Sequence, residues 1–195
     1  MADFATAIPA LVLASGSVAR KALLESLGVV VITYKTDCDE SHQETDPAKA
    51  TELLARRKLA FYQSSHQDYG LPVLSCDTLI SFQGSLIGKP KTREAALQQL
   101  VHFSGKKHEV HSGWALWYQK NVYSGSDLAV ITFKTLSRSC IESYLDTNEW
   151  IGAAGSYRIQ GNGRSLIKKL EGDEATVIGL PLLQISEILD LPLSV

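Results

Sequence analysis

The chain has 195 residues, and its 45% hydrophobic and 21% charged content is typical of a globular protein that needs no disulfide or metal to hold its core. Nineteen Lys plus Arg residues against 21 Asp plus Glu residues give a formal net charge of -2. This balance argues against nucleic acid or an anionic membrane as a partner, because proteins that bind them normally carry a large basic excess.

The first half of the chain alternates strand and helix patterns. An apolar strand is predicted at Leu11–Ala14, and the next helix begins after Ser17 and ends at Gly28. A second strand is expected at Val29–Tyr34. Asp46, followed by proline, then predicts a long helix, because Asp caps a helix N-terminus and Pro favours its first position.

The second half is richer in strands, with one expected at residues 71–82 and a strand pair between Glu109 and Leu136. Three further helix starts are predicted: Thr92, with Leu97, Leu100 and Val101 on the buried face; a capping box of Ser139 and Glu142; and Pro181. These elements predict an α/β fold around a mixed sheet, in a single domain spanning residues 1–195.

Two features favour a cytoplasmic protein. The apolar stretch from Ala5 to Ala14 lacks the basic flank of a signal peptide and is shorter than the roughly 20 residues that span a bilayer. The cysteines Cys38, Cys76 and Cys140 form no CxxC pair, which favours free thiols in a reducing compartment.

The turn Ser15-Gly16-Ser17 is a candidate phosphate-binding loop. A strand that enters a Ser/Gly turn and then a helix exposes backbone N–H groups that suit a phosphate. Arg20 supports this hypothesis, since a cation in the first turn opposes the helix dipole unless an anion offsets it. The alternative is an ordinary N-cap followed by a solvated arginine.

Asp77 stands out because it lies inside an apolar strand. Strand alternation places Val73, Ser75 and Asp77 on one face and Cys76 and Thr78 on the other. An aspartate in such a strand must be paired, hydrogen-bonded or metal-bound, or it must face a cleft. Both a structural and a functional role remain open on this pattern alone.

Further charged residues in the first half suit phosphate chemistry if the fold brings them together. Lys58 and Lys89 would neutralise phosphoryl charge, and Asp39 and Glu40 would offer oxygens to a magnesium-type ion. His108 and His111 are not a metal pair, because an offset of three on a strand points them to opposite faces.

Eight segments occur in a set order: LASGSVARKALLESLG at 13–28, Asp39-Glu40, LARRKLA at 54–60, SCDTLI at 75–80, GKP at 88–90, SGKKHEV at 104–110, AAGSYRIQG at 153–161 and VIGLPL at 177–182. With this order and these separations, residues 11–189 resemble the Maf family of nucleoside triphosphate pyrophosphatases. The resemblance implies an elongated mixed sheet with two lobes around a central cleft, and a homodimer. It also implies hydrolysis of a nucleoside triphosphate to the monophosphate and pyrophosphate with a divalent Mg or Mn ion.

The resemblance also implies roles for individual residues. Asp77 matches the catalytic proton acceptor and, with Glu40, is expected to hold the metal. The expected phosphate-binding residues are Ser15, Ser17, Arg20, Lys58 and Lys89. The positions that choose the base are Ala19, Thr78 and Gln160.

Three residues depart from the family pattern. Val18 and Ala19 replace the proline and first arginine of the usual Ser-Pro-Arg-Arg loop, and Arg158 stands where a glycine is common. Thr78 and Gln160 resemble the branch that acts on dTTP and UTP, so these or modified nucleotides are the expected substrates, with weaker base discrimination. The alternatives are a nucleotide-sensing regulatory protein linked to septum formation and a phosphatase that releases single phosphates.

Overall fold

The computed structural model describes residues 3–66, 70–191 and 193, and one mixed seven-stranded sheet runs through them. The strands are β1 Ala10–Leu13, β2 Val30–Thr33, β3 Val73–Phe82, β4 Ser85–Ile87, β5 Lys107–Tyr118, β6 Asn121–Phe133 and β7 Ile167–Glu171. Their order is β2-β1-β3-β5-β6-β7, with β4 paired to β3. The pairs β1–β2 and β1–β3 are parallel and the others are antiparallel, which confirms the predicted mixed sheet.

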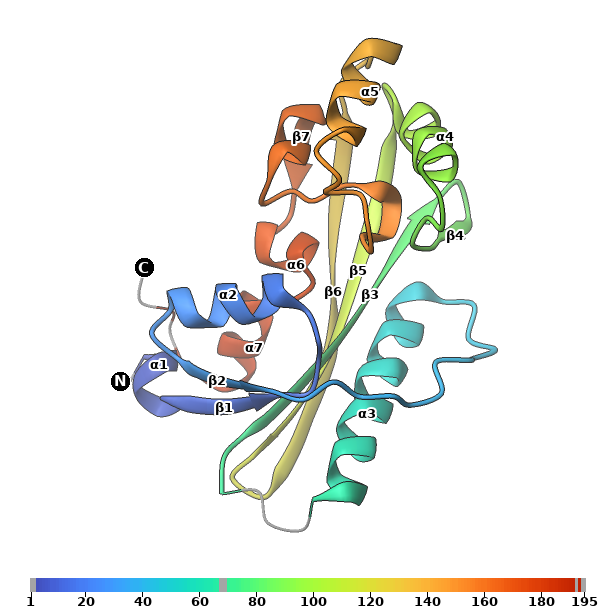
Figure 1. Ribbon diagram of the computed structural model, residues 1–195. Coiled ribbons are helices and arrows are strands. Elements are labelled where there is room, and N and C mark those ends of the chain that lie inside the picture. The colour runs from blue at the N-terminus through green and yellow to red at the C-terminus, as the bar shows by residue number, and fades with distance from the viewer. Residues whose placement is uncertain (1–2, 67–69, 192, 194–195) are drawn as a thin grey trace.

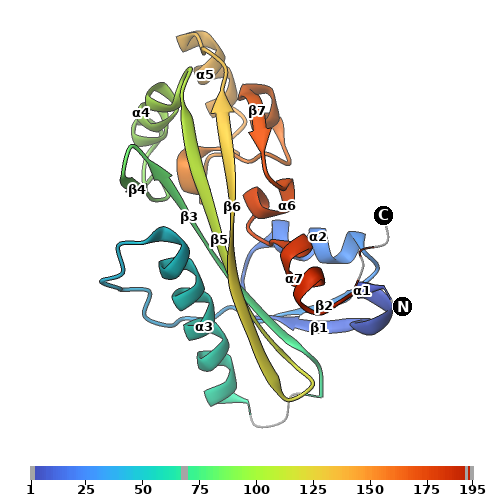
Figure 2. The same cartoon turned by 180° about the vertical axis from the view of Figure 1, so that it is seen from behind.

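Helices pack on both faces of this sheet. They are α1 Phe4–Ala7, α2 Val18–Ser26, α3 Pro47–Ser65, α4 Arg93–Phe103, α5 Arg138–Leu145, α6 Glu174–Ile178 and α7 Leu182–Ile188. Figure 1 shows α3 on the opposite side of the sheet from α2 and α7, and Figure 2 shows the same arrangement from behind. Within the part of the chain that the structure describes, no helix is both long and apolar enough to cross a membrane.

The core is divided into an upper and a lower part, which we call the two lobes. In the lower lobe, helices α1, α2 and α7 cover one face of the sheet and α3 covers the other. In the upper lobe, α4 and α5 pack on the far ends of β3, β5 and β6. The long strands β3, β5 and β6 belong to both lobes, so the middle of β3 lies where the lobes meet.

Local sequence signals account for most helix starts. Ser17, Asp46 and Thr92 are N-caps, and each side chain accepts a backbone N–H from the first turn of its helix, as predicted. The hairpin between β5 and β6 turns at Gln119 and Lys120, whose φ angles of 50° and 66° match the strand twist in a two-residue turn.

Two predictions about helices are wrong. The cap of α5 is Ser137, whose Oγ accepts the Cys140 N–H at 3.2 Å, whereas Glu142 pairs with Arg138 one turn earlier instead of closing a capping box at Ser139. In α4, Val101 is 52% exposed, because the helix turns Ala96, Leu100 and Phe103 toward the upper core instead.

His108 is a buried titratable residue in the upper lobe. Its ring stacks on Phe103, and its Nε2 lies 2.8 Å from the Tyr157 hydroxyl. Burial lowers the pKa of His108 to about 4 from its usual value of 6.5. His111, by contrast, contacts Glu109 on its own strand, and no group of three or more metal-ligating side chains occurs among the residues described.

This burial predicts a pH dependence of stability. The unfolded chain protonates His108 below pH 6.5, whereas the folded protein keeps it neutral down to about pH 4. The free energy of unfolding should therefore fall by about 3 kcal/mol as the pH drops from 6.5 to 4, at about 1.4 kcal/mol for each pKa unit. Urea unfolding at several pH values in this range should show that the free energy of unfolding falls less steeply with pH in His108→Phe than in wild type. An equal dependence on pH in the two proteins would contradict the role of His108.

Candidate active site

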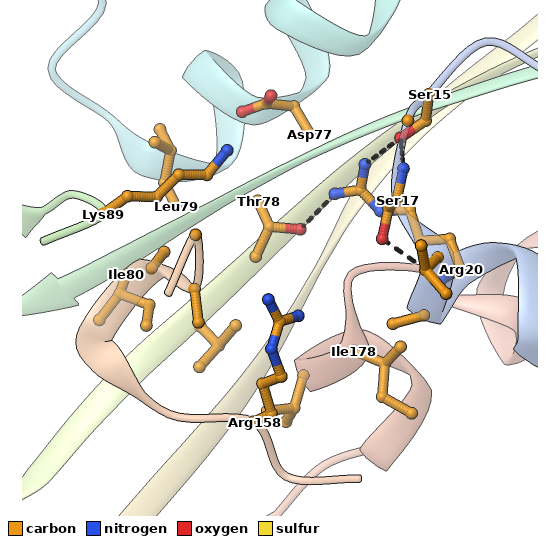
Figure 3. Close-up of a pocket in the computed structure, with 18 of the residues that line it drawn as sticks. Ser15, Ser17, Arg20, Asp77, Thr78, Leu79, Ile80, Lys89, Arg158 and Ile178 are labelled. Carbon is orange, nitrogen blue, oxygen red and sulfur yellow. Dashed lines mark hydrogen bonds between the residues drawn. The ribbon is translucent and has the colours of Figure 1, made fainter. Parts of the chain in front are cut away.

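A cavity of about 1030 Å³ lies between the two lobes, and all ten site residues predicted from the sequence line it. They are Ser15, Ser17, Ala19, Arg20, Glu40, Lys58, Asp77, Thr78, Lys89 and Gln160. The lower lobe supplies the first six of them, and Gln160 comes from the upper lobe. Figure 3 shows several of these side chains converging on the same space from different elements. Asp39, by contrast, is exposed and bonds Ser41 outside the cavity.

The loop between β1 and α2 forms one wall of this cavity. The Ser17 side chain caps α2 by accepting the Arg20 N–H at 3.3 Å, and the Ser17 N–H in turn donates to Ser15 Oγ at 3.2 Å. The first N–H groups of a helix have no partner within the helix, so this wall offers hydrogen-bond donors to an anion. The predicted N-cap is confirmed, and its place on the cavity fits the phosphate-loop hypothesis.

Arg20 connects the loop to two other segments. Its Nε donates to Gly179 O at 2.8 Å, and its Nη1 donates to Ser15 Oγ at 3.0 Å and Cys76 O at 2.9 Å. Its Nη2 donates to Thr78 Oγ1 at 2.9 Å. These bonds use four of the five guanidinium N–H groups. Arg20 therefore holds the walls of the cavity together, and its fifth N–H has no assigned partner among the residues described.

Lys58, Asp77 and Glu40 form an ionic cluster at the centre of the site. Lys58 on α3 and Asp77 on β3 are 9% and 8% exposed, and Lys58 Nζ lies 2.5 Å from Asp77 Oδ1 and 2.8 Å from Glu40 Oε1. The predicted alternation of β3 is confirmed, because Asp77 lies on the face that packs against α3. Among the residues described, Asp77 Oδ2 has no assigned partner, so it remains available to the cavity.

Lys58 and Glu40 stay charged at neutral pH. Burial by itself lowers the pKa of Lys58, but its ion pairs with Asp77 and Glu40 outweigh burial and raise the pKa above its usual value. The hydrogen bond from Lys58 is the main cause that holds the pKa of Glu40 below its usual value, against partial burial and with help from the positive charges nearby, Lys89 among them.

Cations exceed acids around the cavity. Among the described residues that line it, five are cationic, Arg20, Lys35, Lys58, Lys89 and Arg158, and two are acidic, Glu40 and Asp77. This excess contrasts with the whole-chain charge of -2 and creates a local field that favours an anion. Lys35 was missed by the sequence analysis, since it follows β2 with no motif around it, and only the fold brings it beside Gly16.

Arg158 enters the cavity from the upper lobe. Its Nε donates to Glu149 O at 2.9 Å and its Nη2 donates to Ile151 O at 2.8 Å, and both acceptors are backbone carbonyls. Figure 3 shows its guanidinium directed toward Thr78. Arg158 thus brings a cation to the side of the cavity opposite the Ser15 loop.

Thr78 belongs to a hydrogen-bond network that the sequence did not reveal. Its Oγ1 lies 2.9 Å from the Oγ of Ser112 on β5, and Ser112 Oγ donates to Thr176 O on α6 at 2.7 Å. Gly179 closes this corner, because a Cβ there would lie 2.6 Å from Thr78 Oγ1. These partners lie far from Thr78 along the chain, and no local pattern signals them.

Comparison with known proteins gives consistent results. A family model described as Maf-like protein matches residues 10–191. A dTTP/UTP pyrophosphatase of Halalkalibacterium halodurans is 40% identical over 173 residues, which cover 88% of this chain and 90% of that protein. A dTTP/UTP pyrophosphatase of Thermus thermophilus is 36% identical over 181 residues, covering 93% and 94% of the two chains.

Among solved structures, the Staphylococcus aureus Ham1 protein matches with a TM-score of 0.45 and 13% identity, covering 64% of this chain and 71% of that one. The family assignment rests on the sequence matches, which extend over most of the chain, and the range of the family model spans the Ser15–Ser17 loop, Asp77 and the cavity residues of the upper lobe. This chain belongs to the Maf-like protein family.

Proposed function

We propose that this protein is a nucleoside triphosphate pyrophosphatase that converts its substrate to the nucleoside monophosphate and pyrophosphate. The observation that carries the proposal is one cavity that is lined by five cationic side chains and by the buried carboxylate of Asp77. Cations stabilise a triphosphate and the charge that develops on it, and a carboxylate with a free oxygen can accept a proton from water. The relatives named dTTP/UTP pyrophosphatase support the same reaction.

In the proposed mechanism, Asp77 Oδ2 accepts a proton from a water molecule as the water oxygen attacks the α-phosphorus. The bond from the α-phosphorus to the bridging oxygen breaks, and pyrophosphate leaves with that oxygen. Lys58 and Lys89 neutralise negative charge on the phosphates, and the Ser15–Ser17 loop donates hydrogen bonds to their oxygens. Lys58 also fixes the carboxylate of Asp77 by binding its other oxygen.

The donor set of the cluster suits a divalent metal. Lys58 Nζ binds one oxygen of Glu40 and one of Asp77 and so holds the two carboxylates near each other, and Mg²⁺ typically binds one or two carboxylates together with substrate phosphates. We propose that these two residues hold Mg²⁺ or Mn²⁺ when the nucleotide is bound. Such an ion would supply positive charge to the phosphate oxygens.

The base preference and the cellular context are part of the proposal. We propose dTTP and UTP as substrates, supported by the names of the relatives and by Thr78 and Gln160 on the cavity wall.

We also propose a cytoplasmic homodimer without a nucleic-acid or membrane partner. The free thiols Cys38, Cys76 and Cys140 support the compartment, and the apolar side chains of Val30 and Ile32, exposed on edge strand β2, offer a surface for self-association.

Incubation with a panel of canonical and modified triphosphates, with Mg²⁺ or Mn²⁺ and with EDTA, tests this proposal. We expect pyrophosphate and monophosphate from dTTP and UTP, and loss of turnover in EDTA. Nucleotide binding without pyrophosphate would favour a regulatory sensor, diphosphate plus phosphate would indicate a phosphatase, and a strong preference for 7-methyl-GTP would contradict the proposed base choice.

A further inference from the structure

The neighbours of Thr78 determine which atom accepts its hydroxyl proton. Ser112 Oγ lies 2.7 Å from Thr176 O, and a carbonyl carries no proton, so Ser112 must donate its only proton there. The 2.9 Å contact between Thr78 Oγ1 and Ser112 Oγ then requires the proton of Thr78. Thr78 therefore donates its proton into the protein interior.

The groups around Ser112 keep it donating to Thr176, so that it continues to accept the proton of Thr78. Ser112 and Thr176 are both fully buried. The Thr176 hydroxyl donates to Asp127 Oδ2 at 2.5 Å, which holds the middle of α6 against β6. The Thr176 carbonyl also accepts the Gly179 N–H at 3.1 Å, so it keeps one partner even without Ser112.

Arg20 limits how many further hydrogen bonds Thr78 Oγ1 can accept. Its Nη2 donates to Thr78 Oγ1 at 2.9 Å and occupies one of the two lone pairs of that oxygen. With the proton committed to Ser112, Thr78 has one lone pair left for a group in the cavity. It can accept a hydrogen bond from a ligand and cannot donate one.

The Ser15 hydroxyl has the opposite role, because it is left as a hydrogen-bond donor. Its Oγ accepts the Ser17 N–H at 3.2 Å and an Nη1–H of Arg20 at 3.0 Å, which occupies both lone pairs. Its proton is therefore left for an acceptor, such as a phosphate oxygen. Arg20 bonds both hydroxyls, so one side chain sets a donor at one end of the cavity wall and an acceptor at the other.

We propose that Ser112 is a positioning residue for base selection, because it makes Thr78 an acceptor for the N3–H of a uracil or thymine base. N3–H is the only N–H of these bases in a nucleotide, whereas the N3 of cytosine is itself an acceptor. A lone pair on Thr78 would repel the cytosine N3. This inference rests on the proposed function and specifies how the same cavity recognises its substrate.

Binding of α,β-imido analogues of UTP and CTP tests the inference, because these analogues bind without being hydrolysed at the α–β bridge. Calorimetry on the full chain gives the ratio of the two dissociation constants. Wild type should bind the UTP analogue at least about 10-fold more tightly, on the scale of one misdirected hydrogen bond. In Ser112→Ala the Thr78 hydroxyl can rotate and donate, so the ratio should fall to about 3-fold or less.

Ser75→Ala is the matched control. Ser75 is also a fully buried serine of the sheet and donates to the backbone carbonyls of Ala55 and Ala115, without contacting Thr78. It should keep the wild-type ratio. If Ser112→Ala does not fold, Thr78→Val, which lacks the acceptor, should lower the ratio in the same way.

A wild type that binds both analogues equally would place Thr78 against another donor, such as a ribose hydroxyl, and would overturn the inference. An unchanged ratio in a folded Ser112→Ala would also overturn it. Binding is measured separately from turnover, so a wild type that releases no pyrophosphate refutes the proposed reaction while the ratio still decides the role of Ser112.

Discussion

The Asp77→Asn variant should release pyrophosphate about 100-fold more slowly than wild type, or slower still, while it remains folded. The amide has nearly the size of the carboxylate but cannot accept a proton from water at neutral pH. The oxygen of the new amide can still accept the hydrogen bond of Lys58, and Glu40 still pairs with that ammonium. We therefore expect the buried charge of Lys58 to remain paired well enough for the variant to fold. Pyrophosphate release and the thermal unfolding midpoint measure the two effects separately.

Asp39→Asn is the control for this experiment. Asp39 is an exposed acid next to Glu40, and its carboxylate bonds Ser41 outside the cavity. Its loss should leave turnover close to that of wild type. A folded Asp77→Asn protein with near-wild-type turnover would remove Asp77 from the proposed mechanism.

The Gly113→Ala variant should lose both stability and activity. Gly113 lies on β5 directly opposite Asp77 on β3, and a Cβ there would overlap backbone atoms of Thr51 and Glu52 on α3. Since backbone cannot move aside like a side chain, α3 must shift away from the sheet. Overpacking of this kind costs about 1–3 kcal/mol and sometimes more, and we expect at least the upper value.

The loss of activity follows from what α3 carries. Lys58 reaches Asp77 from this helix at 2.5 Å, so a shift of α3 separates the ion pair and misplaces the carboxylate. A displacement of about 1 Å can lower an enzymatic rate by about 100-fold. Urea unfolding and pyrophosphate release should both show the defect.

Gly70→Ala is the matched glycine substitution, because a Cβ at Gly70 meets no atom of the described residues within 4 Å, its chain neighbours aside. Its stability should stay within about 0.5 kcal/mol of wild type, as for most surface changes. If Gly113→Ala were as stable and active as Gly70→Ala, the tight packing of α3 on β5 would not be what positions Lys58.

The sequence predicted those parts of the site that depend on neighbours along the chain. Ser17 as an N-cap and Asp77 on a fixed face of its strand follow from local rules, because capping and strand alternation act over a few residues. The error at Ser139 arose within the same rules. Ser137 and Ser139 are both cap-forming residues, and only the helix backbone shows that the helix begins after Ser137, whose side chain accepts the Cys140 N–H.

The alternation of strand and helix patterns was thus sufficient for the mixed α/β fold, and the resemblance carried by the ordered motifs gave the family and ten of the residues that line the cavity. Only the tertiary structure revealed that Lys58 joins Asp77 to Glu40, that Arg20 uses most of its donors on the protein, and that Ser112 directs the proton of Thr78. The physical reason is the range of the forces involved. Propensity and periodicity act along the chain, whereas the direction of a hydrogen bond and the charge state of a buried group depend on atoms that only folding brings together.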